Sequence, residues 1–293
     1  MRFINFSKYY ADFDYFWGVK SIFSFKPTLS QSWLIALSLV IGSLLVGLIV
    51  GALQLFFPVS LLKCESLSYL VCMLFPFAYI LAKSAEHSGE EGTPLSRNSF
   101  GRLGACAFTL LAILGMLSLG VLTEPLTAFI PMPDSVKNLF EAAFRDLPLW
   151  DGIVSACILA PLCEEFLCRG MMLRGMLCNG VSPRAAIIWS AFIFAAMHMN
   201  PWQALPAFVL GAFFGWVYYQ TGALWLTILL HCVNNSMSTY LTRAFDSLEI
   251  DDGLIDILPT GQYILLYCLC AALFAAVILI FRKNEKTINS YIC

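Results

Sequence analysis

The longest uncharged apolar runs restrict this chain to a fold that is in contact with lipid. The run from Trp33 to Phe57 contains no charged side chain, and about 20 such residues cross a bilayer as a helix. Hydrophobic residues make up 59% of the 293 residues and charged residues only 12%, whereas soluble domains are about half apolar and a quarter charged. A water-soluble fold could not bury this much apolar surface, so we expect an integral membrane protein.

Apolar segments along the whole chain predict an all-α fold, a polytopic transmembrane helical bundle with about eight spans. Ser182 before Pro183 and Asn200 before Pro201 indicate helix starts, because Ser and Asn cap helices and proline is favoured at the first helical position. Gly222 indicates a tight turn. Very short loops therefore join the fourth to the seventh span into an antiparallel bundle. The expected spans are 33–57, 66–83, 103–122, 152–177, 183–199, 201–219, 223–241 and 260–281.

The distribution of charge divides the chain and orients it. Residues 1–149 form an N-terminal membrane region with an interfacial segment over 1–32 and three spans, residues 150–240 a core of four spans, and residues 241–293 an acidic loop, the last span and a tail. Most of the 17 Lys and Arg residues fall on the N-terminal side of the membrane, which is the cytoplasmic pattern. We expect both termini in the cytoplasm. The net charge of −2 indicates no nucleic-acid partner.

Ionisable and amide side chains gather in three of the expected spans. Each ionisable group in a bilayer costs several kcal/mol unless it is paired or faces water, so such groups are candidates for a functional site. The polar side chains are Glu164, Glu165 and Arg169 in the fourth span, His198 at the end of the fifth, and His231 and Asn235 in the seventh.

Helix geometry separates the two adjacent glutamates. Glu165 stands four residues before Arg169, so the two share a helix face in the orientation that favours an ion pair. We expect this pair to be a structural salt bridge that fixes helix packing. Glu164 is rotated by about 100° and still needs a partner. His198 lies at nearly the same depth in the antiparallel hairpin of the two spans, so we expect it to be that partner.

The seventh span offers an imidazole and an amide on one face. His231 and Asn235 are four residues apart, so they point in the same direction, whereas Asn234 is rotated by about 100° and is not included. The alternative interpretation is an interhelical hydrogen-bond clasp, worth about 1–2 kcal/mol in a membrane. Three polar clusters in spans with short connections favour a common site.

These side chains include the functional groups that hydrolysis of a peptide bond needs. A glutamate beside a histidine can hold a water molecule and take its proton, and a second imidazole with an amide can donate hydrogen bonds to an oxyanion. The chain contains neither a GxSxG nor an HExxH motif. Two histidines and a glutamate are also metal-binding side chains, but no fourth ligand is evident.

Taken together, the three clusters resemble the CPBP family, which comprises CAAX proteases and bacteriocin-processing enzymes and is also called the Abi family. The resemblance covers about residues 150–240, with all three motifs in the same order and at the same spacing. The family motif EExxxR matches Glu164, Glu165 and Arg169, FxxxH matches Phe194 and His198, and HxxxN/B matches His231 and Asn235.

The resemblance implies an eight-helix intramembrane endopeptidase of the Ras-converting type. By this likeness Glu164 and His198 activate the water, and His231 and Asn235 line the oxyanion site. Family members have been described both as metalloproteases and as metal-independent glutamate proteases. A divalent metal such as zinc, if bound, would be held by Glu164, His198 and His231. The implied partners are the lipid bilayer and a membrane-associated protein or peptide substrate of unknown identity, and the implied location is the bacterial inner membrane.

Two other functions use the same residues. A non-catalytic immunity or scaffold protein would use the polar cluster only for packing. A proton-coupled transporter would use it as a proton relay, but such a transporter predicts repeat-related halves or discontinuous spans, and the sequence indicates neither.

Overall fold

All long elements in the described part of the chain are helices, as the apolar runs predict. The structure is a computed structural model that describes residues 24–57, 64–87, 89, 95–127, 130–138, 148–244 and 253–285, and these residues contain no strand. Residues 1–23 of the expected interfacial segment and residues 245–252 of the acidic loop lie outside them. The long single helices are α3 (Leu29–Leu53), α5 (Glu65–Glu86), α6 (Gly104–Thr127), α11 (Pro183–Met197), α12 (Pro201–Thr221), α13 (Leu224–Ala244) and α15 (Thr260–Glu285).

Residues 149–178 form one continuous helix that contains two π-helical segments. The six-residue segment α9 carries Glu164 and Glu165 and has π-helical turns on both sides. Such turns are rare and occur frequently at functional sites. We call residues 149–178 the central helix. Its parts are α8 (Leu149–Gly152), the π-helical segment Ile153–Leu159, α9 (Ala160–Glu165), the π-helical segment Phe166–Leu173 and α10 (Arg174–Cys178).

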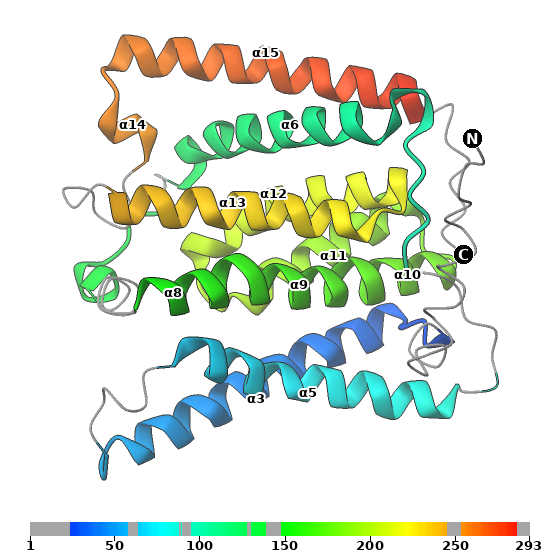
Figure 1. Cartoon of the computed structure of the whole chain (residues 1–293), viewed down its shortest axis with the longest axis vertical. Helices are drawn as coiled ribbons and strands as arrows, with labels where there is room; N and C mark the ends of the chain where they lie inside the picture. The colour runs from blue at the N-terminus through cyan, green and yellow to red at the C-terminus, as the bar shows by residue number, and fades with distance from the viewer. Residues whose placement is uncertain are drawn as a thin grey trace, which may run out of the picture.

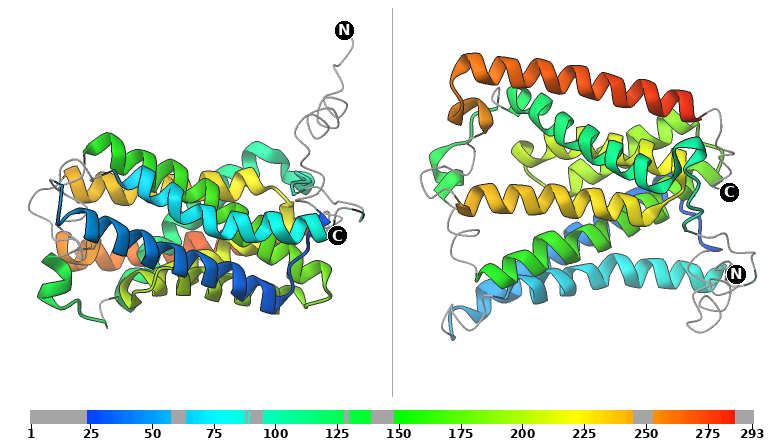
Figure 2. Two further views of the ribbon diagram at one scale, coloured as in Figure 1. Left: turned by 90° about the horizontal axis from the view of Figure 1, so that it is seen from below. Right: turned by 45° about the horizontal axis from the view of Figure 1, so that its top comes forward.

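The helices lie in three groups, with the central helix in the middle one (Figures 1 and 2). At one side α6 packs against α15, and at the other α3 packs against α5. Between them, α11 packs against α12, while α13 runs along the central helix. The short helix α14 (Leu254–Ile257) precedes α15. The helix α3 begins and α15 ends at the same end of the bundle (Figure 1).

The predicted helix starts are confirmed, and one of them lacks its expected side-chain cap. The helices α11 and α12 begin at Pro183 and Pro201. The Asn200 side chain accepts a hydrogen bond from the backbone N–H of Gln203 at 2.8 Å, whereas the Ser182 side chain makes no capping hydrogen bond. Gly222 ends α12 in the left-handed region with a φ of 60°, which glycine adopts without strain.

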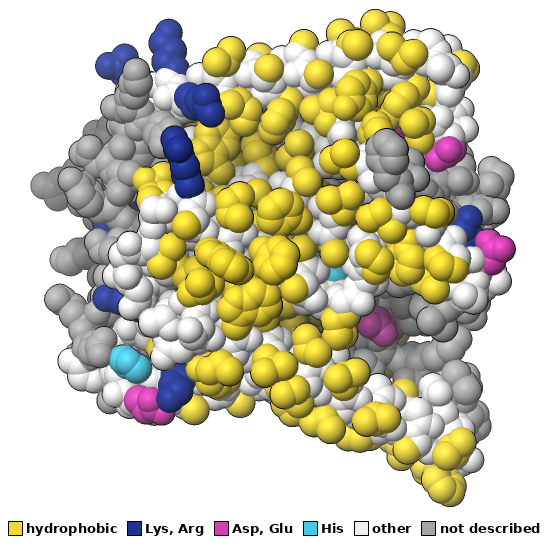
Figure 3. Space-filling model, turned by 180° about the vertical axis from the view of Figure 1, so that it is seen from behind, with side chains coloured by type: hydrophobic (Ala, Val, Ile, Leu, Met, Phe, Trp, Pro, Cys, Tyr) yellow, Lys and Arg dark blue, Asp and Glu magenta, His cyan; other side chains and the backbone are white. Residues whose placement is uncertain are grey.

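The outer surface of the bundle is apolar along the length of the helices. In Figure 3 hydrophobic side chains cover the middle of the face, and Lys and Arg gather along one edge. In the described part of the chain, four helical segments are long and apolar enough to cross a membrane: Leu29–Leu53, Glu65–Glu86, Gly101–Thr127 and Thr260–Asn284. The other four expected spans are helical as well, but the total of eight crossings stays a prediction.

The central helix is fastened to α5 by a buried carboxylate. Asp151 is fully buried and accepts hydrogen bonds from the backbone N–H groups of Glu65 at 2.7 Å and Ser66 at 3.0 Å. The Ser66 hydroxyl also donates to it. These groups belong to the first turn of α5, whose free N–H groups favour a negative charge. Asp151 therefore caps a helix that is remote in sequence and fixes where it begins.

Replacing Asp151 by asparagine should destabilise the protein by about 1–2 kcal/mol, because it removes the negative charge and one of the two acceptor oxygens at the start of α5. Burial raises the pKa of Asp151, but the hydrogen bonds from Ser66 and from the Glu65 N–H leave it lowered overall. The stabilisation is thus present above the ordinary pKa of about 3.9 and is lost as pH falls through the lowered value. In detergent, the melting temperatures of wild type and Asp151→Asn should differ by a constant amount above about pH 5. This difference should become smaller below about pH 4.

A matched control for this variant is Glu86→Gln. Glu86 forms an exposed ion pair with Lys83 at 2.9 Å, and such surface pairs contribute at most about 1 kcal/mol. An Asp151→Asn protein that unfolds at the wild-type temperature at neutral pH would contradict the capping role.

Candidate active site

Glu165 and Arg169 form the predicted salt bridge, and both are completely buried. Arg169 Nη1 donates to Glu165 Oε1 at 2.7 Å, and Nη2 donates to the backbone oxygen of Gly211 on α12 at 2.8 Å. A Cβ atom on Gly211 would lie 3.0 Å from Phe194 Cδ1 and 3.3 Å from Arg169 Nη2. Glycine therefore allows the guanidinium to approach the α12 backbone.

The guanidinium of Arg169 lies at the junction of two apolar cores. Its Cζ is 4.9 Å from the ring centroid of Phe194 and 5.6 Å from that of Phe214. Phe194 belongs to the core of α3, α5, α11 and the central helix, and Phe214 to the core of α6, α12, α13 and α15. Cation–π attraction between the rings and the charge is strong where water is excluded, so Arg169 joins the two halves of the bundle.

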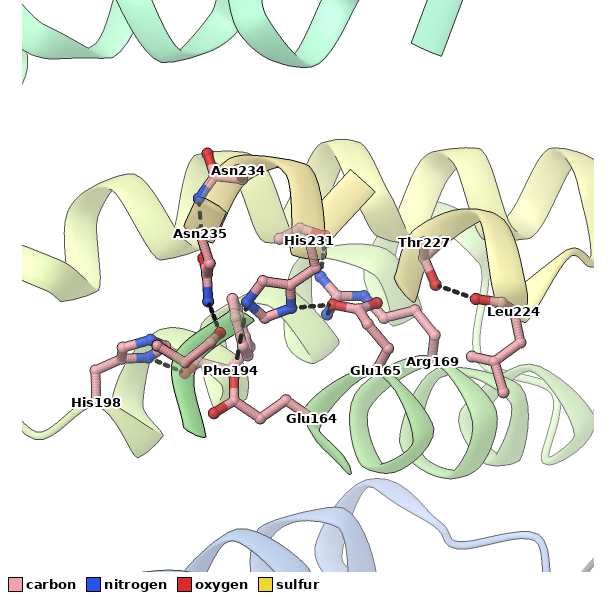
Figure 4. A network of polar contacts seen from close by, with 12 residues as sticks. Glu164, Glu165, Arg169, Phe194, His198, Leu224, Thr227, His231, Asn234 and Asn235 are labelled. Atoms are coloured by element: carbon pink, nitrogen blue, oxygen red, sulfur yellow. Dashed lines mark hydrogen bonds and ion pairs between the residues drawn. The ribbon is translucent and has the colours of Figure 1, made fainter. Parts of the chain in front are cut away.

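His231 on α13 lies between the two glutamates, with one ring nitrogen toward each (Figure 4). Its Nδ1 is 3.0 Å from Glu165 Oε1, and its Nε2 is 3.9 Å from Glu164 Oε2. An ionised carboxylate only accepts hydrogen bonds, so Nδ1 carries the hydrogen. The pairing orients the ring and leaves Nε2 directed at Glu164. The sequence predicted Arg169 as the partner of Glu165 and did not predict His231 as a second partner.

Glu164 is held at its other oxygen by a tyrosine. Its side chain is 16% exposed, and its Oε1 accepts a hydrogen bond from the Tyr69 hydroxyl of α5 at 3.2 Å. The two oxygens thus have different surroundings: Oε1 faces a phenol and Oε2 faces the imidazole of His231. The 3.9 Å separation to His231 is too long for a hydrogen bond and short enough for one water molecule to contact both atoms.

His198 does not pair directly with Glu164, contrary to the expectation from depth. No hydrogen bond or ion pair joins these two described residues, and the Phe194 ring lies close to both histidine rings, 5.0 Å from His198 and 5.7 Å from His231. His198 Nδ1 bonds instead to the backbone oxygen of Phe194 at 2.9 Å. A carbonyl only accepts, so Nδ1 carries the hydrogen and Nε2 of the neutral ring keeps a free lone pair.

The backbone around His198 is held in an unusual conformation. Met199 has a φ of 54°, which costs an ordinary side chain about 1–3 kcal/mol and is found where function requires it. The Asn200 side chain, which caps α12, also donates to the His198 backbone oxygen at 3.1 Å. The short connection between α11 and α12 therefore positions His198, which is the C-cap of α11.

Asn235 connects α13 to the central helix. Its Nδ2 donates to the backbone oxygen of Ala156 at 2.8 Å, and its Oδ1 accepts from Asn234 Nδ2 at 3.2 Å. The sequence argument excluded Asn234 because of its rotation, yet its side chain reaches over to fix the amide of Asn235 (Figure 4). One N–H of Asn235 Nδ2 stays available for another acceptor.

The expected metal ligands do not form a metal-binding group. Among the residues that the structure describes, no set of three or more His, Cys, Asp and Glu side chains is arranged to hold a metal ion. Both histidines bond through Nδ1 to a protein partner, as metal-bound histidines also do, but among the described residues no hydrogen bond or ion pair joins His198 to Glu164 or His231. The arrangement of these nitrogen and oxygen donors therefore does not fit zinc.

Tyr69 is the site residue that the sequence analysis missed. The core of its span contains no charged side chain or histidine, and these residue types were the basis of the predicted site. The available signal was a phenol one turn into an apolar helix, since tyrosine hydroxyls in apolar surroundings usually bind a polar partner.

Comparison with known protein families matches the part of the chain that carries Glu164, His198, His231 and Asn235. Residues 146–237 match a family model described as Type II CAAX prenyl endopeptidase Rce1-like. The match confirms the predicted resemblance to the CAAX proteases over this region, and with the apolar helices it supports an integral membrane protein. No curated protein and no solved structure matches the chain.

Proposed function

We propose that the Rce1-like region at residues 146–237 is the catalytic core of a glutamate-type intramembrane endopeptidase with Glu164 as general base. The observation that carries the proposal is the pair of atoms Glu164 Oε2 and His231 Nε2, 3.9 Å apart. Each is oriented by a second contact, to Tyr69 and to Glu165 respectively. A general base needs a fixed position and a water within hydrogen-bonding distance, and this arrangement supports both.

The attacking water would be placed against Glu164 Oε2. Glu164 takes one proton of the water as the water oxygen bonds to the scissile carbonyl carbon. The second O–H of the water donates a hydrogen bond to His198 Nε2. When the C–N bond breaks, Glu164 returns its proton to the leaving nitrogen, so that an amine and a carboxylic acid result. A carboxylate in a site shielded from bulk water is a competent base for this exchange.

The negative charge on the carbonyl oxygen requires donors in place before reaction. His231 can donate from Nε2 when the ring carries both protons, and the Glu165 carboxylate at Nδ1 balances that charge. Asn235 offers the second N–H of its amide, because Ala156 occupies only the first. Donors of this kind contribute about 3–4 kcal/mol each in the transition state when they are rigidly held.

Substrate and location follow from where the site lies. The polar residues are on helices (Figure 4) of a bundle whose surface is apolar, so the substrate is a peptide segment that reaches into the membrane or is tethered to it. We place the protein in a bacterial inner membrane with both termini cytoplasmic. The common end at which α3 begins and α15 ends supports this orientation. Comparing cleavage of the same peptide with and without a prenyl group tests whether that group is required.

The test is cleavage by the purified protein in proteoliposomes. The probes are farnesylated CaaX tail peptides, the same peptides without the lipid, and membrane-tethered peptides, with products identified by mass spectrometry. We expect wild-type protein to cut at least one of them and His198→Ala to be slower by about 10²–10⁴, as for loss of an acid–base group. EDTA should leave the rate unchanged, because the donors are not spaced for a metal.

Each alternative has its own outcome in this assay. Loss of cleavage with EDTA and recovery with zinc would establish a metalloprotease. Equal cleavage by wild type and His198→Ala would show that His198 takes no part in the reaction. If no peptide is cut, and a Glu164→Ala variant protects cells from a bacteriocin as well as wild type does, the chain is a scaffold or immunity protein.

A further inference from the structure

Glu164 has no described hydrogen-bond partner within the matched region 146–237. Its one hydrogen bond comes from the Tyr69 hydroxyl on α5, at 3.2 Å from Oε1. The contact to His231 at 3.9 Å is longer than a hydrogen bond. The terminal torsion of a glutamate is broad, so a carboxylate without this contact would sample many orientations.

We infer that Tyr69 is a positioning residue for the proposed reaction: its hydroxyl holds Oε1 of Glu164, so that Oε2 faces His231 and the attacking water. The inference rests on the proposed function and extends it, because it makes α5 part of the active site. The matched region therefore supplies the base, and α5, which lies outside that region, supplies the group that orients the base.

The structure places α5 against the central helix at points on both sides of Tyr69. Asp151 caps the first turn of α5 through Glu65 and Ser66, only three residues before the tyrosine. Further along, Phe77 stacks on Phe166 of the central helix, with ring centroids 5.4 Å apart. Contacts at both ends of the segment fix the rotation of α5, which determines where the phenol points.

A second tyrosine on α5 provides a matched control. Tyr79 is half-buried like Tyr69, and its hydroxyl has no hydrogen-bond partner among the described residues. Changing either tyrosine to phenylalanine removes one oxygen from the same helix. Only the change at position 69 removes a contact to Glu164.

The experiment compares wild type, Tyr69→Phe and Tyr79→Phe in the proteoliposome assay, with a peptide that the wild type cuts. Tyr69→Phe should lower kcat about tenfold to a hundredfold, the effect of a lost hydrogen bond to a charged group, with KM within about twofold. A purely structural defect would instead lower the fraction of active protein and the thermal stability. Tyr79→Phe should keep the wild-type kcat.

The outcomes separate this inference from the proposed function. A Tyr69→Phe variant with wild-type kcat, beside a Glu164→Gln variant without activity, overturns the role of Tyr69 and leaves the protease standing. Wild-type protein that cuts no probe overturns both. As a readout independent of turnover, the change in melting temperature for Tyr69→Phe should be smaller in a Glu164→Ala background than in wild type. Equal changes in the two backgrounds would show that the contact does not form.

Discussion

Replacing Glu164 with glutamine should abolish most of the peptidase activity while the protein remains folded. The amide keeps the shape of the side chain but cannot take a proton from water, and loss of a general base lowers kcat by about 10²–10⁴. Glu164 is partly exposed and its contact to His231 is 3.9 Å long, so its replacement leaves the buried pair of Glu165 and Arg169 intact. The measurement is the initial rate of peptide cleavage, normalised to folded protein from size-exclusion chromatography.

The control for Glu164→Gln is the adjacent acid, because the two positions should fail in different ways. Glu164→Gln should unfold at nearly the wild-type temperature and be inactive, whereas Glu165→Gln should be poorly folded. A Glu164→Gln variant that keeps more than about a tenth of the wild-type kcat contradicts its role as base, since such a loss is below that of acid–base groups.

Neutralising one member of the buried salt bridge should have the largest effect on stability. Arg169→Gln leaves Glu165 as a buried charge without its guanidinium, and Glu165→Gln leaves the guanidinium without its carboxylate. Removing one partner of a buried ion pair costs about 3–5 kcal/mol. We expect each single variant to give a low yield of monodisperse protein and a melting temperature well below that of wild type.

The double variant tests whether burial of charge is the reason. Glu165→Gln combined with Arg169→Gln removes both charges, so it should be more stable than Arg169→Gln alone. If the stability loss of the double variant equals the sum of the losses of the two single variants, the two side chains act independently. Lys83→Gln is the matched surface control: its ion pair with Glu86 is exposed, and losing it should cost at most about 1 kcal/mol.

Much of the fold could be predicted because lipid leaves the chain few choices. Backbone groups in a bilayer must bond within the segment, so each apolar run predicts a helix, and all eight expected spans are helical in the structure. Pro183 and Pro201 located two helix starts for a local reason, since proline fits the first helical turn. The Glu165–Arg169 pair followed from the four-residue spacing, which also depends only on neighbours in sequence.

The π-helical turns and the position of His198 could not be predicted in the same way. Regular α-helices have 3.6 residues per turn, and the predicted directions of the side chains rest on that value. The turns on either side of Glu164 and Glu165 are wider. An argument from depth gives the position of a residue along the helix axis and leaves its rotation open. For this reason His198, expected beside Glu164, bonds to the Phe194 backbone instead.

The sequence by itself determined an all-helical membrane bundle, its helix starts, the salt bridge of Glu165 with Arg169 and the residues from which a protease site would be built. These features depend on hydrophobicity and on contacts within one helix. Only the tertiary structure decided that His231 bonds to Glu165 and faces Glu164, and that Tyr69 holds the other oxygen of Glu164. Contacts between helices depend on how each one is rotated about its axis, and packing of the whole bundle sets that rotation.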